Sequence, residues 1–500
     1  MHRRIAGVVG ALVIAGVSLV VAPSAPAAPA GLTLQGVVHL DARLDQLTFF
    51  SPALERTTKV RVLHPPGFDP ATADLPVLWL LHGGFGGFKD WTTVGKAEEL
   101  TAGLDLLVVM PDTGPGGWYS DWKDPATSQG PMRWETYHLR ELYPWIHAHY
   151  GGRDDRSGNA IAGLSMGGFG AMHDAARHPD LFGFAASFSG AVDLLNPGIG
   201  LVTDLSPFIM GGSPTQIWGD RVTNESRWRA NNPVDLAPNL RTLQLQVWTG
   251  DGLPGGKHGG GDPIEGGVWL ASHSFHDRLD ALGIPHLFQD YGPGGHQWPY
   301  WQDDLVATLP AIVQATAAVR ADPTTVAHIA FEPTYSVWGH TVSLERPVYE
   351  RSILTVRPDG FSLKGTGAGT VTTPGRYQPG QTVRAVRVVD GGPPSTIDLV
   401  ADAAGRITVP VDLGPASVTD EYPLATVAAL PHPTVVVTLT SLPAATTTTT
   451  TAPVPSSTAP ATDADALPTT GARSAAPLAV ALLGAALVVR RVRWSAVVRR

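Results

Sequence analysis

A short stretch about one third of the way along the chain does most to limit the fold. Residues 159–171 read NAIAGLSMGGFGA, an apolar run, then a serine between glycines, then a segment compatible with a helix. Gly163, Ser165 and Gly167 have the spacing G-x-S-x-G. This pattern predicts a buried strand that turns sharply into a helix, because glycine lets the two backbones approach closely.

The sequence around this stretch, from residue 31 to about residue 320, alternates between short apolar runs and longer helical stretches. Apolar runs such as LPVLWLLHGG, LDLLVVMPD and LQLQVWTGD end in Gly or Asp, as buried parallel strands do where they enter loops. Helical stretches such as WETYHLRELYPWIHAHY and GVWLASHSFHDRLDALG lie between them. We therefore predict an α/β domain over 31–320, with a doubly wound, mostly parallel sheet.

Downstream of this region the amino-acid composition and its pattern change twice. Residues 327–442 contain short Thr- and Val-rich runs punctuated by Gly and Pro, which predict a small all-β, sandwich-like domain. Residues 443–466 are almost entirely Thr, Pro, Ala and Ser, so we expect them to form a disordered, extended stalk. The role of the β-rich domain is open between carbohydrate binding and spacing.

The first thirty residues have the features of an export signal. Arg3 and Arg4 precede an apolar run from Ile5 to Val21, and small alanine-rich cleavage sites follow it. We expect residues 1–30 to be a secretory signal peptide that is removed. An uncleaved membrane anchor is the alternative, although the apolar run is short for one.

The C-terminal end, residues 467–500, contains a second targeting pattern. The pentapeptide LPTTG ends at Gly471 and is followed by an apolar segment and a basic tail. This order resembles the sortase sorting signal of Gram-positive surface proteins. The resemblance implies cleavage between Thr470 and Gly471 and attachment to cell-wall peptidoglycan. The alternative is a membrane-tethered protein at the outer face, and both readings put the folded part outside the cytoplasm.

Composition narrows the function classes. The formal net charge of −9 argues against a nucleic-acid partner, because a polyanion is bound by a basic surface. The 500 residues contain no cysteine, which excludes disulfides, thiolate metal sites and a cysteine nucleophile. Any covalent catalysis must therefore use another residue, and Ser165 is the candidate.

A catalytic serine needs donors for the oxyanion, and an upstream motif supplies them. In WLLHGGFGGFKDW an apolar strand leads into a glycine-rich loop. We predict an oxyanion hole made by the main-chain amides of Gly84 and of Met166, the residue after the serine. His82 precedes Ser165 in the chain, so we expect it to be structural rather than the base.

The general base is predicted downstream, in DYGPGGHQWPYW. His296 lies in a Gly/Pro loop after an alternating apolar segment, where an imidazole could reach a serine hydroxyl. Three other histidines, His258, His273 and His276, are expected to pack or lie on the surface. The segment HSFHD has a helix-face spacing that suits a metal, but no third ligand is evident, so we expect no metal and no organic cofactor.

Two residues compete for the role of the triad acid. Asp251 lies just past an apolar strand, where many hydrolases have their aspartate. Glu265 instead begins a helix, in DPIEGGVWLASHSF. The residues by themselves leave this choice open.

The motifs together resemble a known family. From about Leu32 to Leu309 the chain resembles the putative-esterase family of α/β hydrolases, which includes esterase D, ferulic-acid-esterase-like enzymes and the antigen 85 mycolyltransferases. The resemblance is carried by LLHGGFGGFKDW, WYSDW followed by WETYHLRELYPWI, IAGLSMGGFGAM, and GGHQWPYWQDDL. It implies an α/β-hydrolase fold. It also favours Glu265 over Asp251, because mycolyltransferase-like members have a glutamate at the matching position.

The chain departs from the mycolyltransferases in one loop. Those enzymes have an acidic and a basic residue, which contact the sugar acceptor, where this chain has His82-Gly83-Gly84-Phe85. The resemblance therefore does not imply trehalose binding. The WYSDW segment could still bind a carbohydrate or an aromatic acyl group through its polar and aromatic side chains, and loop packing is the alternative. The residues concerned are Trp118, Tyr119, Asp121 and Trp122.

These patterns combine into one functional hypothesis with two rivals. We predict an exported, wall-anchored serine esterase that acts on an ester or acyl-lipid substrate through an acyl-enzyme on Ser165. The first rival is an acyltransferase that uses a carbohydrate or glycerol hydroxyl as acceptor. The second is a surface adhesin without catalytic activity, built on the same scaffold. Sortase and peptidoglycan are the other expected partners.

Overall fold

The structure is a computed structural model that describes residues 31–420 and 432–443. Its centre is a nine-stranded sheet with the strand order β1-β2-β3-β5-β4-β8-β9-β10-β11. The first three strands and β5 pair in antiparallel fashion, and β5 through β11 pair in parallel. In chain order the strands are β1 (Thr33–His39), β2 (Leu44–Ser51), β3 (Arg56–Leu63), β4 (Val77–Leu81), β5 (Leu107–Pro111), β8 (Asn159–Leu164), β9 (Phe184–Phe188), β10 (Gln244–Thr249) and β11 (Leu287–Asp290).

The central strands β4, β5, β8 and β9 are buried at every position, because helices cover both faces of the sheet. Along β4, Trp79 belongs to one hydrophobic cluster, and Leu78 and Leu80 belong to a second cluster on the opposite face. Successive side chains of a strand point to opposite faces, so an uninterrupted apolar run is needed to fill two cores. The observed mixed sheet with helices confirms the predicted α/β-hydrolase fold class.

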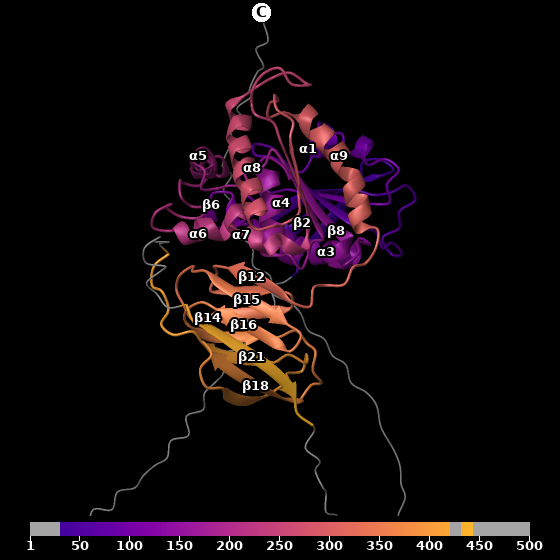
Figure 1. The fold of residues 1–500 in the computed structure, drawn as a ribbon. Helices are drawn as coiled ribbons and strands as arrows, with labels where there is room; N and C mark the ends of the chain where they lie inside the picture. The colour runs from indigo at the N-terminus through magenta and orange to yellow at the C-terminus, as the bar shows by residue number, and fades with distance from the viewer. Residues whose placement is uncertain (1–30, 421–431, 444–500) are drawn as a thin grey trace, which may run out of the picture. The chain divides into compact units, whose positions relative to one another are not determined.

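Figure 1 shows the sheet between α8 and α9. Phe275 of α8 and Phe169 of α4 belong to the first cluster, whereas Leu305 of α9 and Trp91 of α1 belong to the second. The α-helices are α1 (Asp90–Thr93), α2 (Ala97–Leu100), α3 (Tyr143–His149), α4 (Met166–Arg177), α5 (Pro197–Leu205), α6 (Glu225–Asn231), α7 (Pro233–Leu236), α8 (Pro263–Ala281) and α9 (Trp298–Thr316). Four further helical segments are η1, a π-helix (Thr136–Leu142), and the 3₁₀-helices η2 (Arg156–Gly158), η3 (Ser206–Met210) and η4 (Ala237–Thr242).

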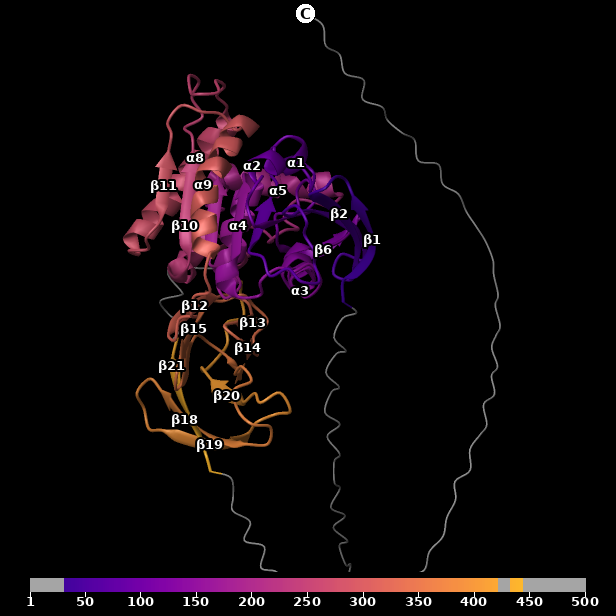
Figure 2. The same cartoon turned by 90° about the vertical axis from the view of Figure 1, so that its right-hand side faces the viewer.

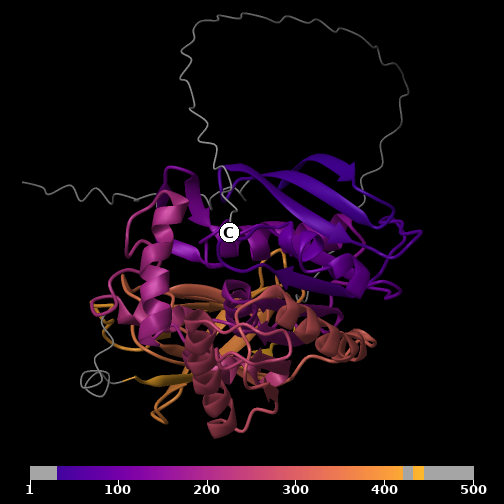
Figure 3. The same cartoon turned by 90° about the horizontal axis from the view of Figure 1, so that it is seen from above.

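The two ends of the sheet are formed by the first and last strands of the domain. Figure 2 shows β1 and β11 at opposite sides, and Figure 3 shows the indigo N-terminal strands separated from the salmon-coloured α8 and α9. The carboxyl ends of the parallel strands meet at one edge of a sheet, where α/β proteins bind ligands. A hairpin of β6 (Asp121–Thr127) and β7 (Gly130–Arg133) lies outside the sheet.

The segment from β12 onward forms two antiparallel sheets. One has six strands in the order β12-β15-β16-β21-β18-β19, and the other has four in the order β13-β14-β17-β20. Both contribute to one hydrophobic cluster, to which β16 supplies Phe361 and β20 supplies Val409. This confirms the predicted all-β, sandwich-like region. The strands are β12 (Val326–Ala330), β13 (Thr334–Val337), β14 (His340–Leu344), β15 (Ser352–Arg357), β16 (Gly360–Lys364), β17 (Ala368–Thr372), β18 (Thr382–Val389), β19 (Ser395–Val400), β20 (Thr408–Asp412) and β21 (Thr434–Ser441).

The α/β and all-β regions belong to one compact unit of the chain. Arg177 of α4 donates to Glu135 and to Glu332, and Glu332 comes just after β12. Asn239 donates from its side chain to the carbonyl of Ile329 and accepts the Ile329 N–H. Polar contacts of this kind tie the two regions together.

Three predicted segments lie outside the described residues: the signal peptide 1–30, the stalk 443–466 apart from residue 443, and the sorting signal 467–500 with Thr470 and Gly471. Within 31–420 and 432–443, no helix combines the length and the apolar character that crossing a membrane requires.

Candidate active site

Ser165 lies on the sharp turn between β8 and α4. Its backbone has φ 55° and ψ −118°, a conformation that residues with side chains rarely adopt. Two glycines make the turn feasible. A Cβ on Gly163 would come within 2.4 Å of the Gly167 carbonyl oxygen, and a Cβ on Gly167 within 2.5 Å of the carbonyl oxygens of Leu81 and His82. The G-x-S-x-G spacing therefore reflects two close backbone contacts that admit no side chain.

His296 brings its imidazole to this serine. Its Nε2 is 2.8 Å from Ser165 Oγ, although the two residues are 131 positions apart. The ring packs edge-on against Trp301 of α9, with 4.9 Å between ring centroids. The His296 side chain is 11% exposed, so most of the imidazole is shielded from solvent.

Glu265 holds the other nitrogen of this ring. His296 Nδ1 is 2.7 Å from Glu265 Oε2, and the Glu265 side chain is fully buried. A carboxylate can only accept, so Nδ1 carries the hydrogen and Nε2 is left to accept the Ser165 hydroxyl. The second oxygen, Oε1, accepts from the Gly250 amide and the Ser189 hydroxyl, each at 2.8 Å. The buried carboxylate is thereby satisfied at both oxygens.

Asp262 supports both members of this pair and is not among the residues predicted from the sequence. Its Oδ2 accepts the main-chain N–H of His296 at 2.6 Å. Its Oδ1 accepts the amides of Ile264 and Glu265, each at 2.9 Å, at the N-cap position of α8. A signal was present: Asp262-Pro263-Ile264-Glu265 is a helix-start pattern, with a capping residue, Pro at the first position and Glu at the third.

Asp251 and His82 do not contact His296. Asp251 Oδ1 accepts the Leu253 amide in its own loop. His82 is 1% exposed and bonds the Gly83 carbonyl through Nδ1, while its Nε2 accepts the Thr113 amide. Both ring nitrogens of His82 are thus engaged in holding the loop that contains Gly84.

The two predicted oxyanion donors border the same cavity as Ser165. Gly84 and Met166 both line it, together with Ser165 and His296. Met166 opens α4, and the first N–H groups of a helix have no intrahelical acceptor. Phe85, next to Gly84, donates its amide to Pro115, which fixes the course of this loop.

The cavity that contains Ser165 has a volume of about 640 Å³. Its wall is mostly aliphatic, and α5, η3 and α8 supply most of that wall. The side chains concerned are Ile199, Val202, Leu205, Ile209, Ile264 and Val268. A lining of this kind suits an apolar ligand group, since few polar atoms would lose their hydration.

The WYSDW residues separate into two groups. Trp118 borders the Ser165 cavity and donates from Nε1 to Ser206. Tyr119 is fully buried, and its hydroxyl donates to the His82 carbonyl. Asp121 and Trp122 line a different cavity, and the Asp121 carboxylate accepts from Thr136. Of these four residues, Trp118 is therefore the one placed to touch a group bound at Ser165.

The histidines noted in the sequence have diverse partners. His258 contacts Asp303, and His273 contacts Asp290. Within the described residues, one group of metal-ligating side chains converges, formed by His276, Asp280 and His286. None of the three lines the cavity that contains Ser165.

Comparison with known proteins identifies relatives for the α/β region. The chain is 34% identical over 293 residues to an esterase of Mycobacterium tuberculosis, covering 56% of this chain and 63% of that protein, less than two thirds of its length. It is 34% identical over 237 residues to the diacylglycerol acyltransferase/mycolyltransferase Ag85B of Mycolicibacterium smegmatis, covering 45% of this chain and 71% of that protein. Among solved structures, the MPT51 protein of Mycobacterium tuberculosis is similar, with 28% identity, a TM-score of 0.45, and coverage of 54% of this chain and 96% of the other.

The family model described as putative esterase matches residues 51–312, a range that includes Ser165, Glu265 and His296. With this match over more than half of its length, the chain belongs to the putative-esterase family of α/β hydrolases.

Proposed function

We propose that this protein is an exported, cell-surface serine esterase that hydrolyses carboxylic esters with an apolar acyl group. The observation that carries the proposal is the continuous hydrogen-bonded series from Ser165 to His296 to Glu265 at an apolar cavity. The esterase named among the relatives supports the same reaction class.

The hydrogen bonds of Ser165, His296 and Glu265 fit the proton transfers of an acyl-transfer reaction. The Ser165 hydroxyl attacks the ester carbonyl while His296 Nε2 takes its proton. His296 then gives that proton to the departing alcohol. Glu265 keeps the Nδ1–H tautomer in place and stabilises the imidazolium that forms, and its burial raises the strength of that interaction. Water, deprotonated by His296, releases the acid from Ser165.

The oxyanion of the tetrahedral intermediate would be bound by the amides of Gly84 and Met166. These are main-chain groups held by neighbouring structure, one by the loop that His82 and Phe85 fix and one by the start of α4. Donors that need no reorganisation contribute most to stabilising developing charge. Side-chain substitutions at these two positions should therefore matter less than changes in backbone course.

The acyl group would lie against the aliphatic wall formed by α5 and α8. Val202 and Leu205 of α5 line the cavity and are also about half exposed, at 49% and 52%. Burial of an acyl chain there removes apolar surface from water on both partners, which favours binding by roughly 0.8 kcal/mol per CH₂. A chain longer than acetyl is therefore the expected acyl group.

Localisation enters the proposal through the chain termini. The predicted signal peptide at 1–30 and the sorting pattern with Thr470 and Gly471 imply export and attachment to peptidoglycan by a sortase. Both segments lie outside the described residues. The experiment is fractionation of cells that produce the full chain, and recovery in the cytosol would contradict this part of the proposal.

Acyl transfer is the second candidate, favoured by the acyltransferases among the relatives. In that reaction a carbohydrate or glycerol hydroxyl replaces water at the acyl-Ser165 stage, and every other step is unchanged. The two reactions differ only in how well the acceptor competes with water. The surface-adhesin alternative requires no reaction at Ser165.

One experiment separates the three candidates. The purified protein and Ser165→Ala are incubated with p-nitrophenyl octanoate, with and without glycerol or trehalose, and both free acid and transferred ester are quantified. Free acid that depends on Ser165 supports the esterase. Transferred ester as the sole product would replace the esterase with the acyltransferase. No product, together with no labelling of Ser165 by a fluorophosphonate, would leave only the adhesin.

A further inference from the structure

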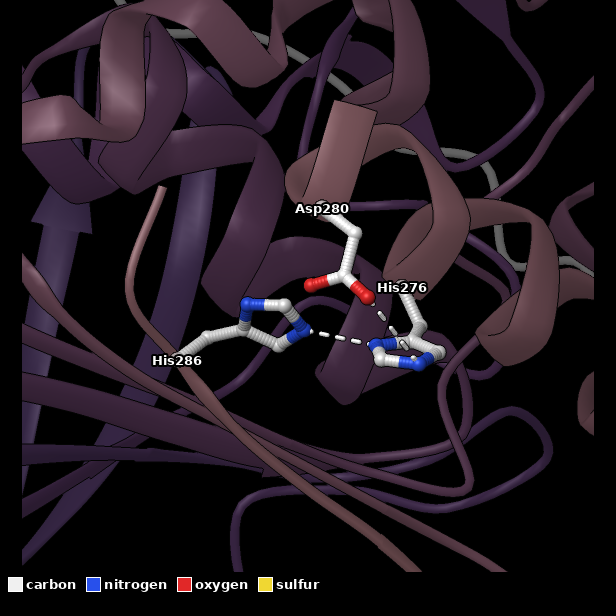
Figure 4. A group of neighbouring side chains, drawn as sticks. All are labelled: His276, Asp280 and His286. Atoms are coloured by element: carbon white, nitrogen blue, oxygen red, sulfur yellow. Dashed lines mark hydrogen bonds and ion pairs between the residues drawn. The ribbon is translucent and has the colours of Figure 1, made fainter. Parts of the chain in front are cut away.

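The C-terminal end of α8 and the segment that enters β11 bring three metal-ligating side chains together. His276 and Asp280 are four residues apart on α8, so they lie on the same face of the helix. His286 immediately precedes β11. Their ligand atoms all lie within 4.8 Å of one another, and Figure 4 shows the two imidazoles and the carboxylate converging. Helix geometry brings His276 and Asp280 together, and the return of the chain from α8 adds His286.

The geometry of His286 is that of a prepared ligand. Its Nδ1 is 2.9 Å from the Ile284 carbonyl oxygen, which can only accept, so Nδ1 carries the hydrogen. The neutral ring therefore has its lone pair on Nε2. That lone pair is directed at His276 Nδ1, 2.8 Å away. Metal-bound histidines commonly have their second nitrogen fixed by a backbone carbonyl in this way.

His276 is also held in position. Its ring stacks on Phe288 of β11, with 4.1 Å between centroids and 4° between planes. Its second nitrogen, Nε2, is 3.6 Å from Asp280 Oδ2. When Nδ1 donates its hydrogen to His286, Nε2 of the neutral ring presents a lone pair to a carboxylate, which repels it. A cation at the centre of the group would remove this repulsion, because all three side chains would then face positive charge.

We propose that His276, Asp280 and His286 form a binding site for a divalent transition-metal ion of the zinc class. Two imidazoles and one carboxylate suit such ions, with metal–nitrogen bonds of about 2.0–2.1 Å and water in the remaining position. The ligands are accessible, since Asp280 is 65% and His276 26% exposed on the side chain. Small rotations of these side chains would open the 2.8 Å contact to the wider spacing of two ligands on one ion.

The site would act on structure rather than on the reaction. It links the end of α8 to the start of β11. Glu265 lies near the start of α8, and His296 lies in the loop that follows β11. An ion that binds the folded chain and not the unfolded chain stabilises the fold in proportion to its occupancy. The expected effect is a higher melting temperature without a change in the chemistry at Ser165.

Zinc binding is tested on untagged protein after treatment with a chelator. Isothermal titration with ZnCl₂ is run on the wild type, on His286→Gln and on His149→Gln. The last is the matched control, because it removes an exposed histidine of α3 that is outside the cluster and contacts Trp145 through its ring and the Trp145 carbonyl. We expect one equivalent to bind the wild type and the control, and His286→Gln to bind at least about tenfold more weakly. Equal binding by all three, or no binding by the wild type, would overturn the proposal.

Two further measurements keep the test decisive if His286→Gln folds poorly. Asp280→Asn changes an exposed side chain and should also weaken zinc binding while its melting temperature without metal matches the wild type. Zinc should raise the melting temperature of the wild type and of His149→Gln more than that of either cluster variant. Ester hydrolysis by each metal-free variant reports folding independently, because none of these residues lies in the Ser165 site. An equal zinc-induced shift in all proteins would contradict a site at this cluster.

Discussion

The Asp262 carboxylate accepts the main-chain N–H of His296, with 2.6 Å between Oδ2 and nitrogen. Its other oxygen caps α8 just ahead of Glu265. One side chain therefore sets the backbone position of the proposed base and the start of the helix that carries the proposed acid. Although burial alone would raise it, the pKa of Asp262 is lowered, because it accepts the amides of Glu265, His296 and Ile264.

Asp262→Ala should reduce turnover without removing any group that touches the substrate. Loss of the acceptor frees the His296 loop, and a misplacement of about 1 Å typically costs roughly 10²-fold in rate. We expect kcat to fall by about that factor while KM changes little. Asp262→Asn retains an oxygen that can accept and should recover much of the loss. Equal defects in the two variants would show that Asp262 acts through its charge instead.

Glu265→Gln should be far more damaging than Asp251→Asn. An amide can present its NH₂ to His296 Nδ1 and favour the wrong tautomer, a change that costs about 10⁴-fold in kcat in a triad of known mechanism. The Asp251 carboxylate accepts the Leu253 amide in its own loop, so Asp251→Asn should keep near-normal activity. Steady-state hydrolysis of one ester by both variants decides the point, and the opposite ranking would reassign the acid.

Acyl-chain preference should depend on the exposed wall of the cavity. Each added CH₂ that is buried should raise kcat/KM roughly threefold to fourfold in the wild type, until the cavity is full. Val202→Asp should flatten this dependence, because it places a charge where the chain lies. Leu201→Asp is the matched control: Leu201 is on the same helix, is 59% exposed and does not line the cavity. A series of p-nitrophenyl esters provides the measurement.

Asp304 should lower the stability of the protein progressively as pH rises. The pKa of this α9 residue is raised well above its ordinary value, because burial disfavours its charge and Glu265 and Asp303 repel it. Above the unfolded pKa of about 3.9, folding must then take up a proton, at a cost of up to about 1.4 kcal/mol per pH unit. The melting temperature of Asp304→Asn relative to the wild type should therefore rise between pH 4.5 and pH 7.5. A difference that does not vary with pH would contradict this.

Glu135 should stabilise the fold in the opposite pH range. Burial alone would raise its pKa, but Arg177 and His178 hold it well below the ordinary value. The contribution is therefore present above the unfolded pKa of about 4.3 and is lost as pH falls toward the lowered folded pKa. Glu135→Gln should lower the free energy of unfolding by about 1.5–3 kcal/mol at pH 7, because Arg177 loses one of its two carboxylate partners and keeps Glu332. Urea unfolding of the wild type and Glu135→Gln should show a smaller difference in the free energy of unfolding at pH 3.5 than at pH 7.

Much of the α/β region could be predicted because its signals are local. Uninterrupted apolar runs such as 77–81 indicate strands covered on both faces, and the glycines around Ser165 indicate a turn with no room for side chains. Local signals could not decide whether Glu265 or Asp251 is the residue that bonds His296. Asp251 lies just past β10, and Glu265 lies in the first turn of α8. Which of them reaches His296 depends on the path of the loop between them, which no local pattern encodes.

Other features depend on contacts between distant segments. Tyr119 and Trp122 have the composition of a binding loop, yet the first is buried against the His82 carbonyl and the second lines another cavity. In the group formed by His276, Asp280 and His286, His286 lies beyond the end of α8. Helix spacing therefore could not indicate that it lies beside the other two. Asp262 could have been recognised as a helix cap, but its bond to His296 could not.

The position of β11 has a consequence for inactivation. This strand of four residues lies at the margin of the sheet, pairs with β10 alone within that sheet, and leads into the loop of His296. Marginal strands open at lower free energy than central ones. Heat should therefore withdraw the imidazole while β8 still holds the serine, so that hydrolysis fades before the protein melts. Loss of activity would then be reversible on cooling, because β10 would remain folded and β11 could pair with it again.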